Sequence, residues 1–271
     1  MSSDHKAIVA EGLGKSYWVG GHMLIDRMGM HALVDRALKA PVQVISRLVS
    51  NQKPSSHFPE IPGHMKWAIR NVSFSVDQGE VLGIVGHNGA GKSVLLKLLS
   101  RITRPTEGRA RLHGRVGSML EAGTSFHGEL TGRENIQLSG AILGMPRPRI
   151  TALMDEIISF SEVEEYIDTP VKRYSTGMIL RLGFSVAAHL DTDIMLIDEV
   201  LAVGDQRFKQ RCIDKMRSVA GSGKTVLFVS HDMDVLKQIS DRAILIREGS
   251  LIMEGAPEQV VAEHVRCTGK S

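Results

Sequence analysis

Residues 86–93 form a glycine-rich motif whose residue types suit the binding of phosphate groups. The segment matches the pattern G-x-x-x-x-G-K-[ST], follows the apolar run 81–85 and precedes a stretch of helical periodicity. Glycines let successive backbone N–H groups curl around phosphate oxygens, and the N-terminus of the next helix adds positive potential. Lys92 would then reach the β- and γ-phosphates of a nucleotide, and Ser93 would ligate magnesium. The predicted binding residues are Gly86, His87, Asn88, Gly89, Ala90, Gly91, Lys92, Ser93 and Val94.

Two carboxylates end a second apolar run, in the sequence Asp-Ile-Met-Leu-Ile-Asp-Glu at 193–199. Four consecutive apolar residues predict a buried strand, and α/β sheets bind ligands at the carboxyl ends of their parallel strands. Asp198 is therefore a candidate magnesium partner, and Glu199 is placed to orient or deprotonate an attacking water. An acidic strand end without a catalytic role is the alternative interpretation.

Two further features could contact phosphate. His231 follows the apolar run 225–229, so it too is expected at a strand end, where a neutral imidazole can hydrogen-bond a γ-phosphate. Before the helical segment 179–190, a second helix N-terminus suited to anions is predicted at Ser175, Thr176, Gly177 and Met178. One nucleotide rarely needs two such helix ends.

These candidate residues need a sheet and helices to position them. Short apolar runs at 81–85, 194–198, 225–229 and 243–247 alternate with longer segments of helical period. This alternation predicts an α/β fold with a mostly parallel core sheet. Residues 133–190 carry helical patterns only, which predicts a helical subdomain at about 122–190.

An insert interrupts the pattern near the N-terminus. Residues 8–17 predict a short strand, and strand-like alternation resumes only at Trp67, so the insert covers about 18–65. Its apolar residues follow the spacing of an amphipathic helix, which Pro41 should end or kink before a Pro-rich linker. This stripe, which could face a partner or its own domain, consists of Met30, Leu33, Val34, Ala37 and Leu38.

Composition narrows the class of protein. The chain has 271 residues, and its 33 Lys and Arg against 30 Asp and Glu give a net charge of +3, too small for a nucleic-acid binder. No apolar segment approaches the roughly 18 residues of a membrane span. Charges scattered through the first 17 residues argue against a signal peptide, and two cysteines point to a reducing compartment. We expect one domain over 1–265 and a short tail at 266–271.

With these motifs in place, residues 8–260 resemble the ATP-binding cassette (ABC) family of P-loop NTPases. The resemblance implies ATP and Mg²⁺ as ligands and an antiparallel β part beside the core sheet. It also implies a head-to-tail homodimer, in which each ATP lies between one subunit's phosphate-binding loop and the partner's signature motif, Ser175–Met178.

The same resemblance assigns roles to single residues. Tyr17 matches the aromatic residue that stacks on adenine, Asp205 matches the acid that crosses the dimer interface, and His231 matches the switch histidine. Glu121 stands in the coupling loop where the family usually has glutamine, so it either ligates magnesium or only couples to a partner. The signature also departs from the commonest pattern, with Tyr174, Thr176 and Met178 in place of leucine, glycine and glutamine.

Three segments, 120–136, 169–178 and 198–205, are similar to ATPase subunits that export O-antigen, capsule or teichoic-acid chains. This similarity implies a peripheral ATPase on the cytoplasmic face of the inner membrane, which drives export of a lipid-linked polysaccharide through a separate permease. Some such proteins carry a C-terminal carbohydrate-binding domain, which we do not expect here. The alternatives are a cassette ATPase of DNA repair or translation, a motor for another exported substrate, and a nucleotide-gated binding module.

Overall fold

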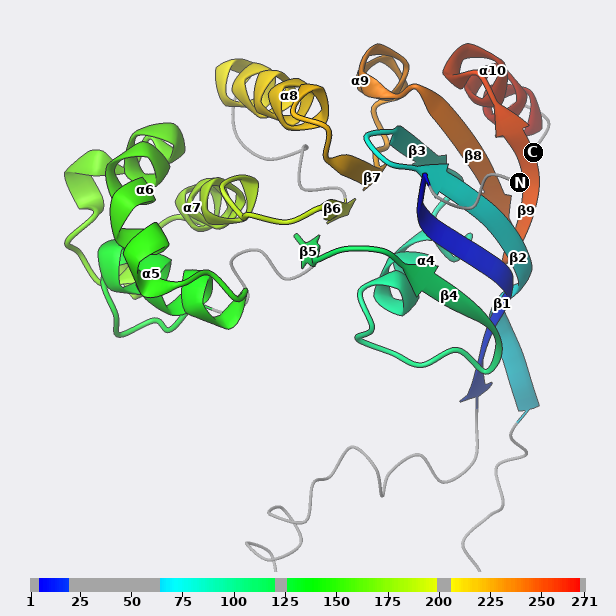
Figure 1. Cartoon of the computed structure of the whole chain (residues 1–271), viewed down its shortest axis with the longest axis horizontal. Coiled ribbons are helices and arrows are strands. Elements are labelled where there is room, and N and C mark those ends of the chain that lie inside the picture. Colours follow the sequence, from blue (N-terminus) through cyan, green and yellow to red (C-terminus); the bar gives the residue numbers. More distant parts are fainter. Residues whose placement is uncertain (1–4, 20–63, 120–125, 199–205, 269–271) are drawn as a thin grey trace, which may run out of the picture. The chain divides into compact units, whose positions relative to one another are not determined.

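The computed structural model describes residues 5–19, 64–119, 126–198 and 206–268 (Figure 1). The chain divides into two compact units, residues 16–67 and the remainder. The predicted insert helix, the coupling-loop residue Glu121, and the acidic residues Glu199 and Asp205 lie outside the described residues. Within the described ranges, no helix combines the length and apolar character needed to cross a membrane.

The larger sheet has six strands in the order β5-β6-β7-β3-β8-β9. Every pairing is parallel except that of β8 with β9. Side chains of β3 and β7 are buried throughout, because both faces of the sheet are covered. This confirms the predicted α/β fold with a mostly parallel core sheet. The strands are β3 (Val81–Val85), β5 (Val116–Ser118), β6 (Ile194–Asp198), β7 (Thr225–Val229), β8 (Arg242–Arg247) and β9 (Ser250–Gly255).

The smaller, antiparallel part of the fold is a three-stranded sheet in the order β2-β1-β4. Its strands are β1 (Lys6–Val19), β2 (His64–Asp77) and β4 (Glu107–Leu112), and Ile8 pairs with Leu112. The strands β1 and β2 therefore extend two residues into each end of the predicted insert at 18–65.

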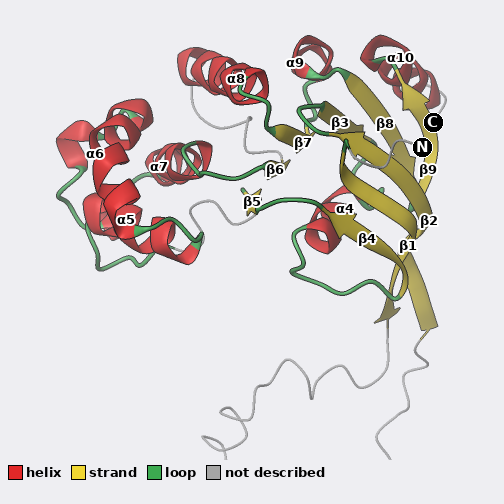
Figure 2. Cartoon of the chain, in the orientation of Figure 1, coloured by secondary structure: helices red, strands yellow, loops and turns green. Residues whose placement is uncertain are grey.

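Alternate side chains of the larger sheet enter two different cores. Leu82 and Ile84 pack with α4 (Lys92–Leu99) and with apolar residues of the smaller sheet. Val81 and Val85 belong to the other core, together with side chains from α8 (Gln206–Gly221), α9 (Met233–Ile239) and α10 (Pro257–Thr268). Figure 2 shows α4 and these three helices on opposite faces of the sheet. Because successive side chains of a strand point to opposite faces of the sheet, each face is covered by its own helices.

Between 132 and 188, the regular elements are helical, in agreement with the hydropathy pattern. They are α5 (Gly132–Ile142), α6 (Arg147–Ser161), α7 (Thr176–Ala188) and two short 3₁₀ turns, Glu164–Tyr166 and Val171–Arg173. A capping box begins α5: Glu134 N donates to Thr131 Oγ1 at 3.2 Å, and Thr131 N donates to Glu134 Oε2 at 2.8 Å. α6 packs against both α5 and α7.

The last helix, α10, ends at Thr268, inside the tail predicted at 266–271. The Thr268 hydroxyl donates to the carbonyl of His264 at 2.9 Å, and Arg266 pairs with Glu263 at 2.8 Å. Contacts between residues three and four positions apart stabilise the last helical turn, which the sequence pattern alone did not reveal.

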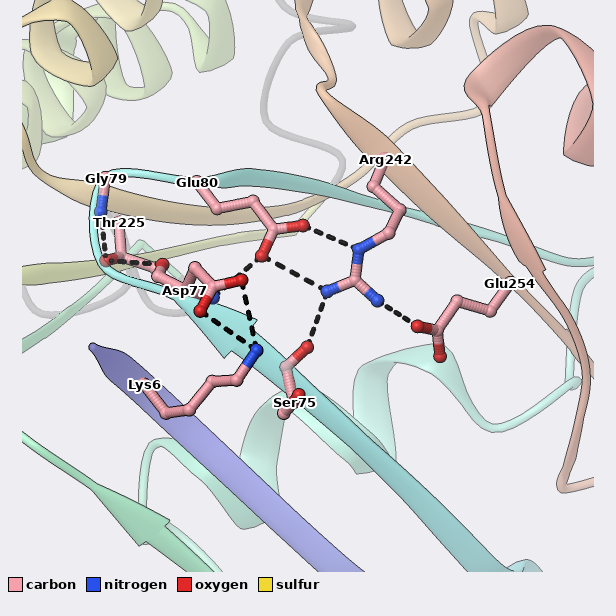
Figure 3. A network of polar contacts seen from close by, with 8 residues as sticks. All are labelled: Lys6, Ser75, Asp77, Gly79, Glu80, Thr225, Arg242 and Glu254. Atoms are coloured by element: carbon pink, nitrogen blue, oxygen red, sulfur yellow. Dashed lines mark hydrogen bonds and ion pairs between the residues drawn. The ribbon is translucent and has the colours of Figure 1, made fainter. Parts of the chain in front are cut away.

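Arg242, the first residue of β8, joins the two sheets (Figure 3). Its Nε donates to Glu80 Oε1 at 2.6 Å, its Nη2 donates to the Ser75 carbonyl of β2 at 2.5 Å, and its Nη1 pairs with Glu254 of β9. We call these three contacts the Arg242 clamp. Glu80 also accepts the backbone N–H of Asp77 at 2.7 Å. The Arg242 and Glu80 side chains are only 23% and 12% exposed, so water competes weakly for these hydrogen bonds.

Replacing Arg242 with methionine is expected to lower the free energy of unfolding by about 2 kcal/mol, because Glu80 keeps its partly buried charge and loses its main partner. Arg109→Met is the matched control, since Arg109 pairs with Glu11 through side chains that are 67% and 41% exposed. The control should change stability by less than about 0.5 kcal/mol. Urea titration of both variants measures the difference, and equal effects would contradict a special role for Arg242.

Candidate nucleotide-binding site

The predicted phosphate-binding loop, at residues 86–93, lies between β3 and the first turn of α4 and depends on glycine geometry. Gly89 and Gly91 have φ values of +79° and +108°, in the left-handed region that side chains disfavour. A Cβ on Gly91 would also lie 2.6 Å from the Ala68 carbonyl oxygen, whereas a Cβ on Gly89 would meet no atom within 4 Å. Gly91 is therefore required by packing, and Gly89 leaves open space beside the loop.

Lys92, at the start of α4, is held inside this loop. The residue is 5% exposed, and its Nζ donates to the carbonyls of Gly86 at 2.6 Å and His87 at 3.1 Å. The loop therefore wraps around a positive charge that the following helix N-terminus reinforces. Phosphate oxygens that enter the loop would meet both the ammonium group and the backbone N–H groups.

A pocket of about 370 Å³ opens at the loop. Among the predicted residues, Gly86 and His87 do not line it but accept hydrogen bonds from Lys92. Ala68 of β2 also contributes to the wall, although no motif pointed to it, because a small apolar residue in a strand carries no local signal. The lining consists of Ala68, Asn88, Gly89, Ala90, Gly91, Lys92, Ser93 and Val94.

Asp198 lies at the carboxyl end of β6, as predicted, in register with Val229 of β7. Its strand packs against α4, which carries Ser93 in its first turn. A hydroxyl and a carboxylate are the hard oxygen donors that Mg²⁺ prefers, and Mg²⁺ takes its other ligands from phosphates and water. No group of three or more His, Cys, Asp or Glu side chains converges within the described part of the chain. The Ser93 hydroxyl and the Asp198 carboxylate therefore suit Mg²⁺ better than a metal that takes all of its ligands from the protein.

His231 is exposed and lies two residues beyond the end of β7. A second imidazole, His264 of α10, was not predicted as part of the site. Partial burial lowers the pKa of His264, and electrostatic interactions with Lys92, His87 and His231 lower that pKa further. The fold therefore brings a C-terminal histidine near the predicted site residues, and only the packing of α10 could have revealed it.

The predicted signature motif begins α7, as expected. Ser175 is the N-cap, and its Oγ accepts the N–H of Met178 at 3.2 Å. Ser175 and Thr176 are exposed, Gly177 and Met178 are half-buried, and none of the four lines the described pocket at residues 88–94. The predicted signature therefore forms no part of the pocket at the phosphate-binding loop of its own chain.

Tyr174 accounts for one departure from the common signature pattern. Its side chain is buried, and its hydroxyl donates to the Tyr166 carbonyl at 2.7 Å. Burial raises the pKa of this phenol, so it remains a hydrogen-bond donor. A leucine could not make this bond. Tyr17, the predicted adenine contact, is 39% exposed near the end of β1, in the unit of residues 16–67.

Comparison with known proteins gives consistent matches. The family described as ABC transporter matches residues 69–202. The O-antigen export system ATP-binding protein RfbB of Klebsiella pneumoniae is 45% identical over 208 residues, which cover 77% of this chain and 85% of that protein. The teichoic acids export ATP-binding protein TagH of Lactococcus lactis is 44% identical over 198 residues, which cover 73% of this chain and 42% of that protein.

Solved structures agree on the fold. A dimeric ATP-binding cassette bound to ADP and phosphate superposes with a TM-score of 0.68 at 18% identity, over 92% of this chain and 98% of that chain. This likeness extends to the α/β architecture that positions the phosphate-binding loop. The sequence similarity to RfbB covers most of both proteins, so it assigns this chain to a family as well as to a fold. The chain therefore belongs to the ABC transporter family of ATP-binding cassettes.

Proposed function

We propose that this chain is the ATP-hydrolysing subunit of a transporter that exports a lipid-linked polysaccharide. The observation that carries the proposal is the buried Lys92 ammonium inside a phosphate-binding loop, beside a 370 Å³ pocket, in a chain 45% identical to an O-antigen export ATP-binding protein. A fixed charge at this place stabilises the β- and γ-phosphates as charge develops in the transition state.

Ser93 and Asp198 would hold Mg²⁺, which neutralises phosphate charge when bound. Glu199 accepts the proton of the attacking water, and the imidazole of His231 hydrogen-bonds the γ-phosphate. The exposure of His231 at the carboxyl edge of the sheet supports this role, because ligands of α/β folds bind at that edge.

The functional unit is a homodimer. Ser175 and Thr176 are exposed at a helix N-terminus and do not line the described pocket of their own chain, so they are available to the ATP of a second subunit. Asp205 crosses the interface, and Tyr17 stacks on adenine. The similarity to a cassette solved as a dimer supports this arrangement.

A membrane permease completes the transporter, with this subunit bound peripherally at the cytoplasmic face of the inner membrane. The names of the relatives, which are ATP-binding proteins of export systems, support a separate membrane partner. Glu121 and the amphipathic insert helix are the segments proposed to meet that permease. An amphipathic stripe supplies an apolar face that a partner can cover.

Deleting the gene in its source cell is expected to remove polysaccharide from the cell surface and to leave lipid-linked chains inside, because synthesis continues without export. Complementation with the wild type or Arg109→Met should restore surface polysaccharide, whereas Lys92→Ala should not. Immunoblots of surface and total lipid-linked polysaccharide measure both pools. Normal surface polysaccharide in the deletion strain would refute this substrate class while leaving ATP hydrolysis to separate assays.

A further inference from the structure

The helix α8 begins immediately after the segment 199–205 and makes an ion pair with the loop that carries His231. Lys209, in the first turns of α8, contacts the Asp232 carboxylate through its Nζ. The Lys209 and Asp232 side chains are 29% and 37% exposed, so the pair is partly shielded from water. It joins α8 to the residue that directly follows His231.

Asp232 makes contacts through both of its carboxylate oxygens and through its backbone. Its Oδ1 accepts the N–H groups of Asp234 and Val235, both at 3.0 Å, and so caps α9. Its backbone N–H donates to Ser230 Oγ at 3.0 Å. The remaining oxygen, Oδ2, is the atom that faces Lys209. Both neighbours of His231 in the chain are therefore fixed, and Lys209 adds the link to another element.

Packing and an ion pair anchor the helix that carries Lys209. Phe208, beside Lys209, is 1% exposed and packs edge-to-face on Phe160 and Phe184 of the helical segment. Arg211 donates to Glu162, at the end of α6, at 2.6 Å. These contacts anchor α8 to α6 and α7, and α8 also packs against α9, whose N-cap is Asp232.

We propose that Lys209 is a positioning residue for His231: its ion pair with Asp232 holds the histidine loop in place and ties it to α8. The inference rests on the proposed role of His231 at the γ-phosphate. The hydrogen bond from Lys209 is the main cause that lowers the pKa of the Asp232 carboxyl. The lowered pKa keeps Asp232 ionised, so the ion pair stays charged. Lys209 acts on the chemistry through His231 and touches no substrate.

Lys209→Met is expected to lower kcat about tenfold while KM for ATP stays within about twofold, because displacement of a catalytic group slows the reaction more than it weakens binding. Lys209→Arg should restore most of kcat by keeping the charge. Lys237→Met is the matched control, because Lys237 pairs with the exposed Asp234 on α9 at 2.7 Å. Turnover and thermal unfolding of the full chain are measured for all three variants.

NMR of the His231 imidazole, assigned with His231→Gln, gives a readout that does not depend on catalysis. Its resonances should shift in Lys209→Met, return in Lys209→Arg, and stay unchanged in Lys237→Met. Wild-type kcat with an unmoved His231 signal would overturn the proposal. The proposal would also be overturned if Lys209→Met lowered the Tm and reduced ATP binding and turnover equally, and if Lys209→Arg did not restore them. Normal turnover in His231→Gln would instead refute the proposed role of His231, while the imidazole shift would still show that Lys209 positions it.

Discussion

Lys92→Ala is expected to lower ATP turnover by at least about 10²-fold and to weaken ATP binding. The substitution removes an ammonium group that the loop carbonyls of Gly86 and His87 hold at 2.6 and 3.1 Å, where phosphate charge accumulates in the transition state. Phosphate release measures turnover, and equilibrium binding of radiolabelled ATP measures affinity.

Lys97→Ala provides the control for this experiment. Lys97 lies on the same helix, α4, but its side chain is exposed and does not line the pocket. Its replacement should leave both ATP binding and turnover close to wild type. If Lys92→Ala hydrolysed ATP at the wild-type rate, the assignment of the phosphate-binding loop would be wrong.

Glu199→Gln is expected to slow hydrolysis by about 10² or more with little change in ATP affinity. Glutamine preserves the size of the side chain but cannot accept the proton of the attacking water. The variant should therefore accumulate an ATP-bound dimer, which gel filtration with and without ATP detects. This prediction rests on the sequence, which places Glu199 directly after the Asp198 strand end.

Asp193→Asn is the matched acid-to-amide control, because Asp193 precedes the opposite, amino end of β6. Its Oδ2 accepts the Arg115 backbone N–H at 2.7 Å, a bond that an amide oxygen can keep. This variant should hydrolyse ATP normally and show no added dimer. A Glu199→Gln protein that stayed monomeric in ATP and hydrolysed it normally would refute both the proton-acceptor role and the dimer.

Local patterns predicted the phosphate-binding loop and the strands around it, because their signals lie within a few residues. The glycines of 86–91 and the apolar run 81–85 define a strand, a turn and a helix without help from the rest of the chain. Asp198 and His231 were placed at strand ends for the same reason: each directly follows or ends a buried run.

Long-range packing was beyond the reach of these patterns. Ala68 lines the pocket and His264 lies near Lys92, His87 and His231, yet both come from elements far from the motif in sequence. The Lys209–Asp232 pair likewise depends on the contact of α8 with α9. Such contacts follow from tertiary geometry, which the period of an amphipathic helix does not specify.

The roles of Glu121, Glu199 and Asp205 stay predictions from sequence, as does the insert helix. Their assignment came from the resemblance to ABC cassettes and from the order of residues around the strand end. In contrast, the membership of the family follows from comparison with relatives along most of the chain. Each of these three residues therefore needs its own substitution.

The Arg242 clamp has a consequence for how this protein can change over evolutionary time. The clamp lies where β3 and β8 begin, whereas the phosphate-binding loop follows the other end of β3. Five residues of strand, about 17 Å, separate the two. Substitutions that adjust thermal stability at the clamp can therefore accumulate without a direct cost to turnover, which weakens the usual trade-off between stability and activity. A lineage that moves to a warmer habitat can adapt through residues at this amino end of the strands, while the residues at the carboxyl end stay unchanged.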